Sequence, residues 1–398
     1  MIELGGGISV EPVWFDSMGA KSSCVFVRTP DASILIDPGA AEMQPSFPMP
    51  ASEKARLCLM ALRRIRRFAG MADCVVISHY HYDHHILPES PEELRGLYAG
   101  KTLLVKDPNR YINASQWSRA RLLFEGLYRG CAGKGLRELS AEPEAGGYPN
   151  PMEGLPEASA LDYGPYRERK AELLRRGMKW FEGLSGLWSR SPWIPPLELE
   201  GLEVRFADGA SFDIGGTRLR FSRPFFHGVE FDRVGWVISV VVERSGIKVV
   251  HSSDLQGPTI EDYASWIIEA DPDLLFLDGP PTYMLGYALN RINLERAIEN
   301  AVRIISDSRA ETIVYDHHLL RDRLYERRVG RVYEAGRRLG KGVLTAAELF
   351  GLRPAVLEPP RDVRRGGIGP RSSRRRPPRA SPDRRSAPPT PSRGHRSR

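Results

Sequence analysis

The sequence has few cysteines and no long apolar run. Only four of its 398 residues are cysteine (Cys24, Cys58, Cys74 and Cys131), and no two of them form a C-x-x-C pair. This spacing excludes a disulfide framework and a cysteine-based zinc site, so we interpret the four as small buried side chains. No apolar run approaches the length of a membrane span, and the opening MIELGGGISVEPVWF lacks the basic start and apolar stretch of a secretory signal. We therefore expect a cytoplasmic protein without a membrane span.

The chain also lacks a basic surplus outside its last forty residues. Its net charge of +7 and pI of about 9.2 would ordinarily indicate a nucleic-acid partner. From Arg361 to Arg398, however, there are thirteen arginines against two aspartates, which leaves 44 basic and 48 acidic residues in the rest. This tail is rich in Arg, Pro and Ser and cannot bury a core, so we predict disorder over 361–398. It either contacts RNA or lipid non-specifically or is a solvated extension without function.

Strand and helix signals alternate along most of the remaining chain. SSCVFVRT and ASILIDPG are predicted to form a hairpin through PDA, and a helix follows over 52–70, capped by Ser52 and ended by Gly70. The strand DCVVI comes next. From residue 201, strands first follow one another and then alternate with helices, one of which we expect Asn293 to cap. This order favours an α/β fold in which helices cover a sheet.

Residues 105–200 differ from the rest. They contain a Gly- and Pro-rich stretch around 143–165 and a helical stretch, YRERKAELLRRGMKWFEGLSGLW, with apolar residues at helical spacing. We interpret them as a largely helical insertion into a domain formed by 1–104 and 201–352, suited to be a lid or the dimerisation arm of a homo-oligomer. YINASQWSRARLLF within it reads as a capped amphipathic helix, although its polar groups could instead face a substrate. These are Asn113, Ser115, Gln116, Arg119 and Arg121.

Histidine is concentrated rather than scattered. Eight of the nine histidines fall at 79–85, 227, 251 and 317–318, and the first group forms SHYHYDHH directly after a buried strand. Residues two apart on extended backbone point to the same side, so His79 and His81 can hold one metal ion. Asp83 and His84, past the turn, can face a second. Neutral imidazole suits zinc, and a carboxylate lowers the net charge of a bound dication.

The H-x-H-x-D-H spacing resembles the metallo-β-lactamase superfamily. That resemblance covers roughly residues 8–350 apart from the insertion, and it implies a four-layer αββα sandwich. The other expected elements follow in order: Asp37 in LIDPG, His227 in FFHGVEFDRVGWVI, Asp254 in VVHSSDLQG, and a histidine in VYDHHLL. More narrowly, SHYHYDHH, LDGPPTY and DHHLLRD look like an uncharacterised archaeal family within the superfamily.

The resemblance also implies a division of ligands between two metals. His79, His81 and His227 would hold one ion, Asp83, His84 and His317 the other, and Asp254 would bridge them. His317 is preferred over His318 because the RNase Z branch places H-x-S-x-R after this strand, and Arg321 stands four residues after His317. Further side chains are expected to orient the ligands or meet the substrate, although the two aspartates Asp278 and Asp316 could simply cap turns. The set is Asp37, His85, His251, Asp278, Asp316, His318 and Arg321.

The implied function is that of a dinuclear metal-dependent hydrolase. Two divalent ions, zinc or alternatively manganese or iron, would share a hydroxide and the Asp254 carboxylate, with Asp83 and Asp254 as the catalytic carboxylates. A phosphodiester of nucleic acid or a nucleotide ranks first as substrate, because H-x-H-x-D-H with a bridging Asp is the layout of the nuclease and cyclic-nucleotide branch. A thioester or lactone, as in the glyoxalase II branch, ranks second. The third alternative is a non-catalytic metal-binding protein that the tail docks onto RNA.

Overall fold

Alternating apolar residues in the N-terminal strands send side chains into two separate cores. In β3 (Ser23–Arg28), Cys24 and Phe26 belong to one apolar cluster, and Val25 and Val27 belong to another. A sheet with two buried faces must be covered on both sides, which places this sheet in the interior of a layered fold. The computed structural model describes residues 1–144, 147–199 and 201–357. The predicted disordered tail, 361–398, lies outside the described residues.

Two sheets form the middle of the molecule and face each other across a cluster of valine, isoleucine and leucine side chains. Val27 and Val76 contribute to this cluster from the first sheet, and Val242 and Val249 contribute from the second. The first sheet runs, in spatial order, β1 (Ile2–Glu3), β2 (Ser9–Phe15), β3, β4 (Ser33–Ile36), β5 (Cys74–Ile77), β6 (Lys101–Val105), β8 (Leu202–Phe206) and β7 (Leu197–Leu199). The second runs β17 (Gly342–Leu344), β16 (Thr312–Asp316), β15 (Leu274–Asp278), β14 (Ile247–His251), β13 (Val240–Arg244), β10 (Thr217–Phe221) and β9 (Ser211–Ile214). A short ribbon pairs β11 (Phe225–Phe226) with β12 (Trp236–Val237).

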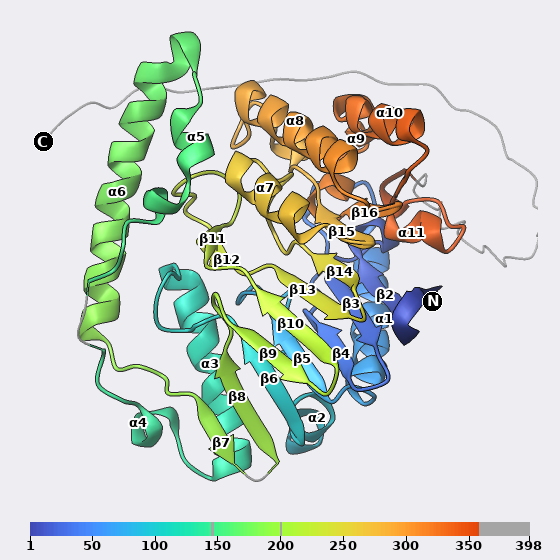
Figure 1. Ribbon diagram of the computed structural model, residues 1–398. Coiled ribbons are helices and arrows are strands. Elements are labelled where there is room, and N and C mark those ends of the chain that lie inside the picture. The colour runs from blue at the N-terminus through green and yellow to red at the C-terminus, as the bar shows by residue number, and fades with distance from the viewer. Residues whose placement is uncertain (145–146, 200, 358–398) are drawn as a thin grey trace, which may run out of the picture. The chain divides into compact units, whose positions relative to one another are not determined.

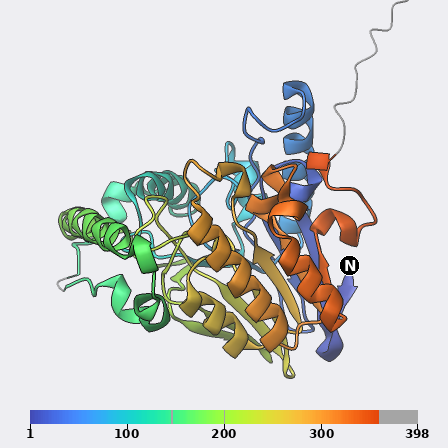
Figure 2. The ribbon, with the colours of Figure 1, turned by 90° about the horizontal axis from the view of Figure 1, so that it is seen from above.

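Helices cover the outer face of each sheet, so the order of layers is αββα (Figures 1 and 2). The first sheet is covered by α1 (Ala51–Ala69), α2 (Pro91–Leu97) and α3 (Ala114–Ala132), and the second by α7 (Glu261–Ala270), α8 (Arg291–Asp307) and α10 (Gly330–Leu339). The predicted four-layer sandwich is confirmed.

Among the described residues, no helix is both long enough and apolar enough to cross a membrane. The shorter helices are α4 (Leu136–Leu139), α5 (Pro156–Ala160), α9 (Tyr325–Arg328) and α11 (Ala346–Leu349), with 3-10 turns η1 (Gly5–Gly7), η2 (Asp16–Met18), η3 (Pro151–Gly154), η4 (Gly164–Tyr166), η5 (Thr282–Met284), η6 (His317–Arg321) and η7 (Ala355–Leu357).

Two predicted helix caps are wrong. Helix α1 begins at Ala51 after Pro50, and no side chain caps it, so Ser52 lies inside its first turn. Helix α8 begins one turn earlier than expected, because the Asn290 side chain accepts the backbone N–H of Asn293 at 2.8 Å. Asn290 is therefore the cap, and Asn293 is the residue whose N–H it binds. The predicted end of α1 at Gly70 is confirmed.

The segment predicted as an insertion connects β6 to β8, which are parallel neighbours in the first sheet. Its longest helix is α6 (Arg167–Arg190), which runs along one side of the molecule (Figure 1). Of the predicted apolar face, Phe181 and Leu184 are buried, whereas Leu173 is 38% exposed. The sheet resumes before residue 201, because β7 already pairs with β8. A role for this segment as lid or dimerisation arm stays a prediction.

Candidate metal centre

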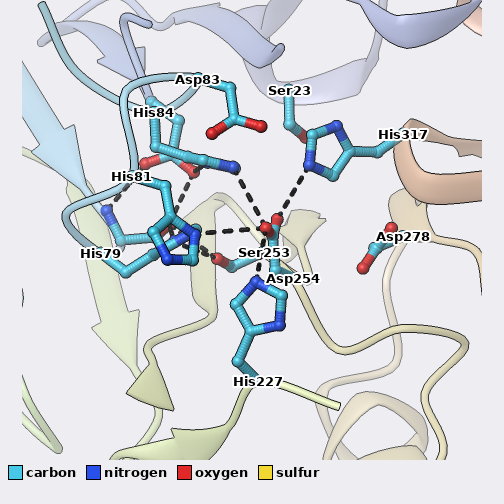
Figure 3. Close-up of polar contacts among 12 residues, drawn as sticks. Ser23, His79, His81, Asp83, His84, His227, Ser253, Asp254, Asp278 and His317 are labelled. Carbon is cyan, nitrogen blue, oxygen red and sulfur yellow. Dashed lines mark hydrogen bonds and ion pairs between the residues drawn. The ribbon is translucent and has the colours of Figure 1, made fainter. Parts of the chain in front are cut away.

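The predicted metal ligands follow the ends of strands from both sheets at one edge of the sandwich. His79 comes two residues after β5, Asp254 three residues after β14, and His317 directly after β16. The carboxyl ends of parallel strands meet at the same edge of a sheet, where open α/β folds place their sites. His227 arrives from the short ribbon, directly after β11. Figure 3 shows these side chains pointing toward one another.

Asp254 lies at the centre of this cluster. Its Oδ2 lies 3.0 Å from Nε2 of His227, 3.2 Å from Nε2 of His84 and 3.4 Å from Nε2 of His79. Its Oδ1 lies 3.3 Å from Nε2 of His317 (Figure 3). The two oxygens of one carboxylate therefore face different histidines.

Two groups of donor atoms are compact enough for a metal ion each. His79, His81, His227 and Asp254 bring one atom apiece within 4.8 Å of one another, and so do Asp83, His84 and His317. A third such group contains Asp254, His317 and His318, so the structure brings His318 close as well. These groups correspond to the two predicted ligand sets.

The donor atoms fit metal ions better than they fit each other. Nε2 of His84, Nε2 of His317 and Oδ1 of Asp254 are buried and have no hydrogen-bond partner in the described part of the chain. A buried polar atom without a partner costs roughly 1–3 kcal/mol. A cation between these atoms would satisfy all three, and imidazole with carboxylate is the donor set that zinc, manganese and iron accept.

Protonation of the histidines depends on their neighbours. Burial and the nearby His84 lower the pKa of His79 to about 4, although Asp254 opposes them. Burial also lowers the pKa of His84, but Asp254 and Asp37 outweigh that effect and raise it to about 10. Burial raises the pKa of Asp254, yet His84, His317 and His79 hold it well below its ordinary value. Asp254 is therefore a carboxylate, and positive charge at this place is what stabilises it.

A layer of polar side chains orients the outer ring nitrogens. Nδ1 of His84 donates to Oδ2 of Asp37 at 2.8 Å, and Asp37 also accepts the Ser78 hydroxyl at 2.7 Å. Nδ1 of His317 donates to Oδ1 of Asp16 at 2.9 Å. Such carboxylate–histidine contacts fix the ring and make its other nitrogen available to a metal.

Asp16 is the residue of this layer that sequence reasoning missed. It is fully buried, and besides His317 it accepts Nε of Arg321 at 2.6 Å and the backbone N–H of Ser22 at 2.9 Å. A weak signal was present, because Asp16 ends the first long strand as Asp37 ends its own. Its partner His317 is 301 residues away, so no local pattern connects the two.

Two more of the predicted residues, Arg321 and His318, contact carboxylates around the cluster. Arg321 joins Asp16 to Asp83, since its Nη2 lies 3.4 Å from Oδ2 of Asp83. Nδ1 of His318 faces Asp278 at 3.0 Å, while Nε2 lies 4.0 Å from Asp254.

Three of the predicted residues act on the backbone rather than on a ligand ring. Asp316 accepts the backbone N–H groups of Ser17, His317 and Ala346, so it caps η6, one of the alternatives that the sequence left open. His251 contacts Ser23, and His85 contacts the carbonyl oxygen of His81 at 2.9 Å.

A cavity of about 480 Å³ opens onto the cluster. Its polar lining includes the metal-ligand candidates His81, Asp83, His227 and Asp254. This volume falls within the range of small-molecule sites. Other polar side chains of the lining are Lys21, Tyr82, Arg119, Asp232, Gln256, Tyr283, His318 and Arg321.

Fold and site together define a metallo-β-lactamase-fold protein with a histidine- and aspartate-rich cluster able to hold metal. Residues 19–85 match the metallo-beta-lactamase superfamily. Over 362 residues, 89% of this chain and 97% of the relative, the sequence is 34% identical to a UPF0282 protein of Methanopyrus kandleri. It is 32% identical to a UPF0282 protein of Pyrococcus furiosus over 88% of this chain and 90% of that one. The chain belongs to this archaeal UPF0282 family, as the sequence predicted.

Solved structures with a similar fold are more distant. The metallo-beta-lactamase fold protein YhfI of Bacillus subtilis is 12% identical with a TM-score of 0.39, covering 85% of this chain and 95% of that one. The short form of human tRNase Z is 15% identical with a TM-score of 0.34, covering 78% and 92%.

Proposed function

We propose that this protein is a metal-dependent hydrolase whose substrate is a phosphodiester. The observation that carries the proposal is the central position of Asp254. Its carboxylate oxygens lie within 3.4 Å of Nε2 atoms of histidines from both ligand sets, namely His79, His84, His227 and His317. His79, His81 and His227 would hold one ion, Asp83, His84 and His317 would hold the other, and Asp254 would be shared. Two bound divalent ions supply an activated water and stabilise the charge that develops on the substrate.

The chain's own residues prepare the rest of the site. Asp37 and Asp16 hold the rings of His84 and His317. No serine or cysteine lines the cavity within the described residues, which fits a reaction that uses water rather than a protein nucleophile. In hydrolysis the water oxygen forms a bond to phosphorus, the bond from phosphorus to the leaving oxygen breaks, and a proton passes to that oxygen. His318 lines the cavity, and because burial lowers its pKa well below the usual range and its Nδ1 faces Asp278, its Nε2 carries no proton at rest. Nε2 would therefore take the proton from the attacking water and pass it to the leaving oxygen.

Charge in the cavity favours a phosphodiester over a neutral lactone. Lys21, Arg119 and Arg321 all line it. Cations at a phosphoryl-transfer site bind the substrate anion and stabilise the additional negative charge of the transition state.

Metal content is the first test. Elemental analysis of purified protein should give about two divalent ions per chain, and His227→Ala and Asp254→Ala should each lose metal. Asp213→Ala, which removes an exposed carboxylate paired only with Arg218, is the matched control and should keep both ions. One tightly held ion that is indifferent to Asp254 would contradict the shared-carboxylate arrangement and favour a structural or sensing role.

Turnover separates the substrate classes. The metal-loaded protein should hydrolyse bis(p-nitrophenyl) phosphate, and Asp254→Ala should abolish this activity. A glutathione thioester serves as the comparator for the glyoxalase II alternative. Turnover of the thioester without turnover of the phosphodiester would overturn the proposal.

A further inference from the structure

Two basic side chains in the cavity form no ion pair with an acidic residue that the structure describes. Arg321 is engaged by Asp16 and Asp83. Lys21 and Arg119, in contrast, form no ion pair with any described residue, although both line the same cavity. Both are half-buried. Holding an unpaired cation in a partly desolvated place is unfavourable, which points to an anion that binds there.

The two cations reach the cavity from different parts of the chain. Arg119 reaches the cavity from α3, and its guanidinium carbon lies 4.9 Å from the centre of the Tyr82 ring. Lys21 comes from the turn before β3, and its ammonium is under the electrostatic influence of Asp83 and Arg321. Burial and the charge of Arg321 both lower the pKa of Lys21, so an added anion would stabilise its charged form.

The acidic residues of the cavity are engaged elsewhere. Asp83 is paired with Arg321, and Asp254 lies among the histidines. Oδ1 of Asp232 accepts the backbone N–H of Val234 at 3.0 Å. Asp83 and Asp16 attract Lys21 without forming an ion pair with it, and Arg119 pairs with no described carboxylate, so both charges can still meet a ligand.

Aromatic surface lies beside the cations. Tyr82 is 41% exposed and Tyr283 is half-buried, and both line the cavity. Exposed aromatic rings in a basic groove are the surfaces on which nucleic-acid bases stack, and an arginine over the ring strengthens that contact.

We propose that Lys21 and Arg119 bind a second phosphate of the substrate, next to the phosphodiester that is cleaved. The substrate class is then a nucleotide or short oligonucleotide end that carries a phosphate besides the scissile one. This proposal rests on the proposed function, because it takes the metal cluster as the place of cleavage. It assigns to α3, in the predicted insertion, a direct part in substrate selection.

The test compares two dinucleotides that differ only in a terminal phosphate, pTpT and TpT. The metal-loaded wild type should prefer pTpT by at least tenfold in kcat/KM. Arg119→Gln and Lys21→Gln should each bring the ratio of kcat/KM for pTpT over that for TpT to about one, through a higher KM for pTpT. Arg129→Gln, on the same helix but paired with Glu125 at the surface, is the matched control and should keep the preference. Equal kcat/KM for the two dinucleotides in wild type would overturn the second-phosphate site and leave the hydrolase proposal intact.

Binding without turnover separates failure of this inference from failure of the proposed function. Calorimetry should show that thymidine 3′,5′-bisphosphate binds the metal-loaded wild type. Its affinity should be at least tenfold lower for Arg119→Gln and unchanged for Arg129→Gln. If no phosphodiester is hydrolysed but this binding pattern is seen, the function fails and the phosphate site stands. Equal binding to Arg119→Gln and wild type would sink the phosphate site. Hydrolysis of a coenzyme A thioester alone would overturn the nucleotide class, and circular dichroism of each variant checks folding.

Discussion

Nζ of Lys170 in α6 lies 2.5 Å from Oε2 of Glu230, three residues after His227. The Glu230 side chain is fully buried, and Nη2 of Arg296 in α8 approaches its other oxygen at 2.9 Å. The same loop packs on α6 through Trp236, whose ring stacks on Trp180 with centroids 5.4 Å apart. The long helix of the predicted insertion thus holds the loop that brings His227 to the candidate metal centre.

Removing the Lys170 ammonium should destabilise the protein strongly. Lys170→Met leaves the buried Glu230 with the Arg296 guanidinium and the Tyr163 hydroxyl, and breaking a buried ion pair typically costs about 3–5 kcal/mol. Because Arg296 remains, we expect the lower end of that range in the free energy of unfolding, measured with urea. Arg169→Gln, which removes a neighbouring exposed pair with Glu172, should change it by at most about 0.5 kcal/mol. Equal effects of the two substitutions would show that the pair does not secure the loop.

Stability should fall in acid through Glu230. Burial raises its pKa, but Lys170 and Arg296 outweigh that effect and lower it from 4.5 to about 2. A carboxyl with a lowered pKa in the folded state stabilises the protein above about pH 4.5, and that contribution is lost as the pH falls toward 2. The free energy of unfolding lost through Glu230 should approach about 3 kcal/mol. The loss should stay below that figure, because burial also lowers the pKa of its partner Lys170. The free energies of unfolding of metal-free wild type and Glu230→Gln, measured with urea, should differ less at pH 3 than at pH 5.5. A difference independent of pH would contradict this origin.

Two glycines of α6 should respond to alanine in opposite directions. A Cβ at Gly177 would lie 2.4 Å from Cβ of Phe231, an atom that cannot move without the backbone, whereas a Cβ at Gly183 would meet nothing within 4 Å. Gly177→Ala should therefore destabilise the fold by about 1–3 kcal/mol through overpacking. Gly183→Ala should stabilise it by up to about 1 kcal/mol through helix propensity. Thermal unfolding of both variants tests the fit of α6 against the His227 loop, and a stabilising Gly177→Ala would refute it.

Neutralising Asp16 should weaken one metal more than the other. Asp16→Asn keeps the shape of the side chain but removes the charge that orients Nδ1 of His317 and pairs with Arg321. Loss of such an outer contact typically lowers metal affinity 10–100-fold. Metal titration of metal-free Asp16→Asn against a chromophoric chelator should resolve two binding steps. The affinity of one step should be lowered, and that of the other should equal wild type. Asp213→Asn should leave both steps as in wild type, and a uniform loss of both steps in Asp16→Asn would indicate general unfolding instead.

The part of the site that is local in sequence could be predicted from sequence. His79 and His81 alternate on extended backbone, and Asp83 with His84 follows within one turn, so their spacing alone brings four donors together. The family resemblance then predicted His227, Asp254 and His317 as further ligands. In the structure, each of them follows a strand that ends at the same edge of the sandwich.

Contacts between distant segments could not be predicted in this way. The pairs Asp16–His317 and Lys170–Glu230 join segments 301 and 60 residues apart, and of these four residues only His317 belongs to a recognisable motif. The cap of α8 was missed for a local reason, because two suitable asparagines stand three residues apart and the helix begins after the first, Asn290.

Arg119 shows the difference most clearly. Its sequence context favoured a capped amphipathic helix over a substrate contact. Only the packing of α3 beside the histidine loop puts its guanidinium over Tyr82 and into the cavity. Local periodicity and spacing thus determined the layers, the metal-binding motif and the family, because they depend on neighbours in the chain. The tertiary structure alone decided which charges are paired and which are left for a substrate, because that depends on segments that meet only when the chain folds.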